Sequence, residues 1–165
     1  MARQADGYSG VQIGLHWLIA ALVAFQLVFG ASMTTVVDAA DEGGTVSAAD
    51  QVLGTAHFWV GLAILALAFA RFGVRLWAGA PAHSGNAHPL VALAANVMHW
   101  LFYGLLFAVP VLGLLAYFVG DPFGDLHALA KPVFIVLIAV HAAAALFNQF
   151  VLKDGTLVRM LRRAA

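Results

Sequence analysis

The chain has 165 residues, of which 63% are hydrophobic and only 10% are charged, whereas a soluble domain of this size carries about 25% charged residues. The formal net charge is zero with His counted as neutral, so the sequence offers no electrostatic basis for binding nucleic acid. Cysteine is absent, which excludes disulfides, thiolate metal sites and covalently attached c-type haem, and leaves seven histidines as the main candidate metal ligands.

Four apolar segments are long enough to cross about 30 Å of hydrocarbon. A spanning segment must satisfy its backbone hydrogen bonds internally, so each segment is expected to be a helix. The sequence therefore predicts an all-α integral membrane protein, a four-transmembrane-helix bundle that forms a single domain over residues 1–165. The predicted helices cover residues 12–33, 52–76, 90–119 and 126–152.

The connections between these segments differ in charge. The first loop, residues 34–51, and the third loop hold six acidic residues and no Lys or Arg: Asp38, Asp41, Glu42, Asp50, Asp121 and Asp125. Seven of the eight basic residues belong to the opposite side, namely Arg3, Arg71, Arg75, Lys153, Arg159, Arg162 and Arg163. Lys131 is the exception. Because Lys and Arg accumulate on the inner side of membranes, both termini are predicted to be cytoplasmic.

Two histidines of the last segment, His127 and His141, are fourteen residues apart. Fourteen helical residues rise about 21 Å through nearly four turns, so both imidazoles leave the same helix face near opposite membrane surfaces. The predicted topology places His16 near the cytoplasmic surface and His57 near the outer surface. We therefore expect an outer pair, His57 with His127, and an inner pair, His16 with His141. A functional role is the default expectation for such residues in lipid.

Each pair offers two neutral imidazoles from different helices, which is the axial ligand set of a low-spin haem suited to electron transfer. A zinc or copper site is the competing interpretation. Zinc usually takes three or four protein ligands, and no carboxylate lies at membrane depth in the predicted helices, so haem fits better. Gly54 and Gly61, which flank His57, would leave room for a flat macrocycle; alternatively, such small residues permit close helix packing.

Several other residues keep more than one interpretation. His99 could replace His16 as the partner of His141, bond a haem propionate or a quinone carbonyl, or be structural. Arg71 and Arg75 could pair with propionates of the inner haem, or merely follow the inner positive charge. His83 and His88 fall in a Gly/Pro/Ala-rich loop and are expected to be solvated.

Five stretches together resemble the bacterial cytochrome b-561 family. They are His16-Trp17, His57, the run M-H-W-L-F-Y-G-L-L-F-A-V-P-V-L-G-L from Met98, V-H-A-A-A-A-L-F from Val140 and K-D-G-T-L-V-R-M from Lys153. The resemblance covers nearly the whole chain. It implies a multi-pass protein of the bacterial inner membrane with two b-type haems, whose iron ligands would be His16, His57, His127 and His141. The family histidine that corresponds to His99 is not an axial ligand.

Members of that family pass electrons between quinones and other donors or acceptors. One branch resembles a superoxide oxidase, which takes electrons from external superoxide and reduces ubiquinone. Such an enzyme would benefit from a positive outer surface, whereas here only Lys131, one turn from His127, is basic on that side. We therefore expect transmembrane electron transfer from an external, periplasmic donor to membrane quinone. A non-catalytic subunit that docks a redox partner is the alternative, and a haem carrier or sensor is a third.

Overall fold

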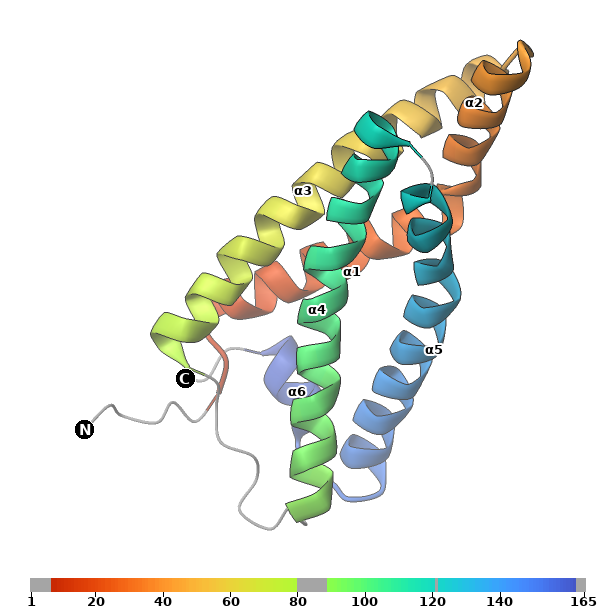
Figure 1. Cartoon of the computed structure of the whole chain (residues 1–165). Coiled ribbons are helices and arrows are strands. Elements are labelled where there is room, and N and C mark those ends of the chain that lie inside the picture. The colour runs from red at the N-terminus through yellow and green to blue at the C-terminus, as the bar shows by residue number, and fades with distance from the viewer. Residues whose placement is uncertain (1–6, 80–88, 121, 163–165) are drawn as a thin grey trace.

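The computed structural model describes residues 7–79, 89–120 and 122–162 (Figure 1). The expectations for Arg3, His83, His88, Asp121 and Arg163 fall outside these residues. The described residues form helices and no strand. The helices are α1 (Gly10–Phe29), α2 (Ala31–Glu42), α3 (Ala48–Ala78), α4 (Pro89–Val119), α5 (Phe123–Phe150) and α6 (Thr156–Leu161).

Four of these helices, α1, α3, α4 and α5, are long and apolar enough to cross a membrane. This confirms the predicted all-α bundle with four membrane-spanning helices. In the bundle α1 packs on α3, α3 on α4, and α4 on α5. Many large apolar side chains point outward, such as Trp77 at 90% and Phe118 at 73% exposure. Exposed apolar surface of this extent is suited to contact with lipid.

The prediction of a loop over residues 34–51 is wrong, because part of that segment forms a further helix. α1 ends at Phe29 and not at residue 33, and after Gly30 the chain forms α2, which covers Ala31–Glu42. A tertiary contact accounts for this helix. A Cβ on Gly54 of α3 would lie only 2.9 Å from Cγ2 of Val36, so the missing side chain lets α2 pack directly on α3.

Asp50 connects the N-terminal turns of α2 and α3. Its carboxylate accepts a hydrogen bond from the Ser32 hydroxyl of α2 at 2.9 Å and from the Ser47 hydroxyl at 2.7 Å. Ser47 is also the N-cap of α3, and its side chain accepts the backbone N–H of Asp50. The acidic first loop is therefore an ordered pair of helices at the outer end of the bundle.

The C-terminal helix α6 returns to the beginning of α1. The indole N–H of Trp17 donates to the backbone oxygen of Met160 at 2.8 Å. The side-chain oxygen of Gln149, on α5, accepts the N–H groups of Leu157 and Val158. Both ends of the described chain therefore lie at the same end of the bundle, as the predicted topology requires (Figure 1).

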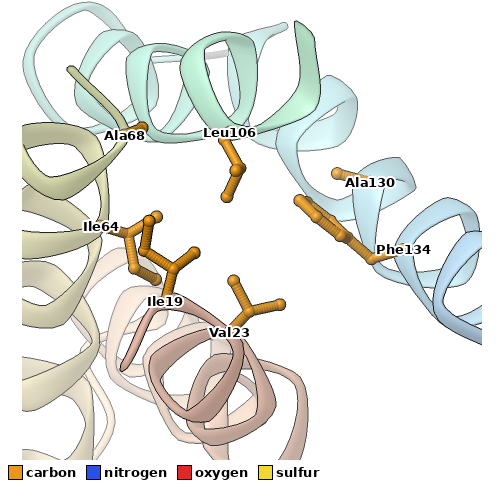
Figure 2. Packing of buried hydrophobic residues seen from close by; sticks show 7 residues of the cluster. All are labelled: Ile19, Val23, Ile64, Ala68, Leu106, Ala130 and Phe134. Carbon is orange, nitrogen blue, oxygen red and sulfur yellow. The ribbon is translucent and has the colours of Figure 1, made fainter. Parts of the chain in front are cut away.

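The buried core lies midway along the bundle, where side chains from all four long helices meet (Figure 2). It consists of Ile19, Val23, Ile64, Ala68, Leu106, Ala130 and Phe134. Phe134 is seven residues from His127 and seven from His141, which is a rise of about 10 Å in each direction along α5. The core thus separates an outer layer of histidines from an inner one.

Candidate functional site

The outer histidines face each other between α3 and α5. The ring centroids of His57 and His127 are 5.8 Å apart, with the ring planes at 77°. A metal–imidazole bond is about 2 Å long. Two rings on opposite sides of one metal ion therefore have their centroids about 6 Å apart. The outer pair has the spacing that two axial ligands of one iron require.

The surroundings of His127 determine which of its ring nitrogens is available. Its Nδ1–H donates to the backbone oxygen of Val109 on α4 at 2.9 Å, because a carbonyl can only accept. In the neutral imidazole this bond places the proton on Nδ1, so that Nε2 is the nitrogen able to bind a metal. Gly113, one turn further along α4, gives the ring its place, since a Cβ there would lie 3.0 Å from Cε1 of His127.

The glycines beside His57 serve helix packing, which was the alternative interpretation of their small size. Gly54 contacts α2 near Val36, and a Cβ on Gly61 would lie 3.4 Å from Nε2 of Gln26 on α1. That amide nitrogen donates to the backbone oxygen of His57 at 2.9 Å. Sequence reasoning missed Gln26, although a polar side chain within an apolar membrane segment was a signal that could have found it.

Three imidazoles gather at the inner end of the bundle. His141 has its ring centroid 6.3 Å from that of His16 and 5.9 Å from that of His99. Phe102 lies against the same ring, with the centroids 5.4 Å apart. Both candidate partners of His141, His16 and His99, are thus at the spacing of an axial pair.

Arg71 lies near these histidines, and Arg75 follows it one turn later on α3. Arg71 and Arg75 line a pocket at the inner end of the bundle together with Tyr8, Gln12 and Tyr103. The guanidinium of Arg71 donates to the backbone oxygen of Gln12 at 3.1 Å and lies within electrostatic range of His16 and His141. This cationic pocket can bind a carboxylate or another anionic group.

Each histidine pair offers two imidazole nitrogens to a site. Within residues 7–79, 89–120 and 122–162, no three His, Cys, Asp or Glu side chains come close enough to hold one metal ion together. A tetrahedral zinc centre usually requires three or four protein ligands, whereas a haem in six-coordinate form requires two. The arrangement of the histidines therefore fits haem.

The amino-acid sequence then assigns the cofactor class. Residues 7–163 match the family model of the prokaryotic cytochrome b561. This chain belongs to the prokaryotic cytochrome b561 family. It is accordingly a membrane haem protein of electron transfer that binds haem b, and its four spanning helices make it a multi-pass protein of the bacterial inner membrane. These conclusions agree with the expectations from the sequence.

Individual relatives align over almost their whole length. Cytochrome b562 of Cereibacter sphaeroides is 38% identical over 160 residues, which cover 96% of this chain and 98% of the relative. A protein of Yersinia pestis named probable superoxide oxidase CybB is 28% identical, with 93% of this chain and 95% of the relative covered. Cytochrome b561 homolog 1 of Escherichia coli is also 28% identical, over 94% and 97% of the two chains.

Proposed function

We propose that this cytochrome moves electrons across the bilayer through two haem b groups, each bound by two histidines. The outer ligands are His57 and His127, and the inner ligands are His16 and His141. The observation that carries the proposal is the presence of two imidazole pairs, with centroids 5.8 and 6.3 Å apart, at the two ends of one bundle. Each bound iron supplies one-electron redox chemistry between its ferric and ferrous states.

At the inner site we assign His16 to the iron and His99 to a neighbouring role. The match to the family model includes both histidines. The assignment therefore follows the resemblance noted above, which gives the histidine of the third long helix no axial role. His99 lies near enough to His141 to contact the macrocycle or one of its substituents. Arg71 and Arg75 are the groups we assign to the inner haem propionates, because Arg71 lies within electrostatic range of His16 and His141 and Arg75 lines the same pocket as Arg71.

For the overall reaction we propose that electrons from an external donor enter at the outer histidine pair, which would hold one haem, and that membrane ubiquinone is the acceptor. Superoxide is the candidate donor because one relative, at 28% identity, is named a probable superoxide oxidase. Oxidation of two superoxide ions yields two dioxygen molecules and two electrons. These electrons, with two protons, reduce one ubiquinone to ubiquinol, so that the reaction balances.

A second candidate function is electron transfer without catalysis, as a subunit that docks a basic redox partner. The observation that favours it is the acidic outer end, where α2 exposes Asp38, Asp41 and Glu42. Such a surface attracts cations and repels an anionic donor such as superoxide. Ubiquinone reduction by the purified chain with superoxide as the sole donor supports the enzyme; reduction only in the presence of a cationic redox protein supports the subunit.

The two-haem assignment is tested by a pyridine haemochrome assay on the purified protein. The expected result is about two non-covalent haem b groups per polypeptide, together with the reduced-minus-oxidised spectrum of a low-spin b cytochrome. A ratio near one, or a metal other than iron in stoichiometric amount, would contradict the assignment. A chain that binds haem reversibly and exchanges no electrons with quinone would instead be a carrier or a sensor.

A further inference from the structure

Two complementary polar atoms of the outer site are buried without a hydrogen-bond partner among the described residues. One is Nδ1 of His57, and the other is the side-chain oxygen Oε1 of Gln26. Buried polar atoms are nearly always paired, because an unpaired one has lost its hydrogen bonds to water without replacement. An imidazole nitrogen that can carry a proton and an amide oxygen that can accept one are suitable partners for each other.

The packing of α1 on α3 brings the Gln26 side chain to the backbone of His57. The side-chain amide Nε2–H of Gln26 donates to the backbone oxygen of His57 at 2.9 Å. This bond holds the Gln26 side chain of α1 against the residue of α3 that is the proposed ligand. Two glycines border this contact. A Cβ on Gly61 would lie 3.4 Å from that Nε2, and a Cβ on Gly30 would lie 3.6 Å from Nδ1 of His57.

The opposite ligand shows what His57 lacks. His127 donates its Nδ1–H to the Val109 carbonyl, and this bond orients its ring and leaves Nε2 for the metal. Histidines that bind a metal almost always donate the other ring N–H to such an acceptor, and these acceptors raise the basicity of the ligand. For His57 the side-chain oxygen of Gln26 is the buried acceptor that is still unused.

We propose that Gln26 is a positioning residue of the outer haem site, whose Oε1 accepts the Nδ1–H of His57 when His57 binds the iron through Nε2. The inference rests on the proposed role of His57 as an axial ligand. In this arrangement both His57 and His127 donate Nδ1–H to an oxygen. The acceptor for His127 is a backbone carbonyl, whereas the acceptor for His57 is a side chain. A side-chain acceptor allows substitution to tune the redox potential of this haem.

The test compares two replacements of similar size, Gln26→Met and Gln26→Glu. Both remove the amide N–H that donates to the His57 carbonyl. They differ in whether a side-chain oxygen remains to accept from Nδ1 of His57: glutamate keeps one and methionine does not. Without the acceptor the imidazole is a weaker base and favours ferrous iron, so Gln26→Met should shift the ferric–ferrous equilibrium of the outer haem roughly tenfold, which raises its potential by about 59 mV. Gln26→Glu should lower the potential.

The readouts are an optical redox titration and the electron paramagnetic resonance spectrum of the oxidised protein. A carboxylate acceptor should also change the largest g value of the outer haem, because it strengthens the axial ligand, whereas a distant charge changes only the potential. A lowered potential with unchanged g values in Gln26→Glu would overturn the proposal. So would shifts of the same sign in both variants, or loss of the outer haem from both, which would assign Gln26 a structural role through the His57 carbonyl.

Gln12→Met is the matched control. Gln12 lies on the same helix, and its amide also donates to a backbone oxygen, that of the α3 C-cap Gly79 at 3.0 Å, at the other end of the bundle. This control should leave the outer haem unchanged. Failure of the proposed function is recognised separately, because a wild-type protein without an outer haem, or His57→Ala protein that keeps it, refutes the ligand assignment before any Gln26 variant is considered.

Discussion

The backbone oxygen of Val109 accepts the Nδ1–H of His127 at 2.9 Å, so α4 orients a candidate ligand that α5 carries. In the proposed arrangement α4 supplies no iron ligand of its own. Its contribution is this carbonyl together with the gap at Gly113, one helical turn further along the same face. The helix without a ligand therefore decides which nitrogen of His127 faces the cofactor.

Gly113→Ala should weaken the outer site. The added methyl group would lie 3.0 Å from Cε1 and 3.1 Å from Nδ1 of His127, so the ring must move and its bond to Val109 must lengthen. Loss of such a supporting hydrogen bond lowers metal affinity by roughly 10- to 100-fold. Gly104→Ala is the control, because a Cβ there meets nothing within 4 Å. Equal haem retention in the two variants, measured by haem transfer to an apoprotein acceptor, would contradict this prediction.

Single replacements of the four proposed ligands should fall into two pairs, and both variants of a pair should lose the same haem. His57→Ala or His127→Ala should remove the outer haem, and His16→Ala or His141→Ala the inner one, since each pair lies at its own end of the bundle. Every variant should retain about one haem per chain with an intact low-spin spectrum. The pairing is wrong if His57→Ala and His141→Ala proteins lose the same spectral component.

His99 has a separate test, because its ring is as close to His141 as that of His16. We expect His99→Ala to retain both haems and to change the spectrum or the potential of the inner one. His16→Ala should eliminate the inner haem. The reverse outcome, in which His16→Ala spares the inner haem and His99→Ala abolishes it, would make His99 the ligand opposite His141.

Arg71→Gln should lower the redox potential of the inner haem. A nearby positive charge favours the reduced, more negative form, and at an effective dielectric constant near 20 one charge contributes roughly 1–2 kcal/mol, or about tenfold in the ferric–ferrous equilibrium. Lys153→Gln removes the same charge from an exposed position and serves as the control. For the same reason the inner haem of the wild type should have the higher potential. An inner potential below the outer one would refute this charge argument.

Reduction of the oxidised protein by superoxide should be slow and should accelerate as salt is added. The outer end carries Asp38, Asp41, Glu42 and Asp125 in exposed positions, which repel an anion until salt screens them. Lys131, also exposed on α5 near His127, is the local attraction that opposes them. Stopped-flow measurements at increasing ionic strength give the sign, and rapid reduction that slows with salt would show that Lys131 dominates.

Much of this architecture follows from the sequence alone. The lengths of the apolar segments determine four spanning helices, because lipid leaves the backbone no other way to satisfy its hydrogen bonds. The fourteen-residue spacing of His127 and His141 determines two layers, since helical rise depends only on residue number. The partners His57 and His16 followed from helix direction, and their rings do lie beside His127 and His141.

The tertiary structure decided what depends on neighbours. The helix α2 replaces a predicted loop because Gly54 lets it pack on α3. No local pattern in the sequence of α2 predicts that contact. Tertiary packing also sets the surroundings of the outer histidines. Only when helices distant in sequence come together do the Val109 carbonyl, the space at Gly113 and the unpaired amide oxygen of Gln26 lie near these rings. Periodicity specifies which face a side chain leaves, whereas its hydrogen-bond partner is set by the packing of one helix against another.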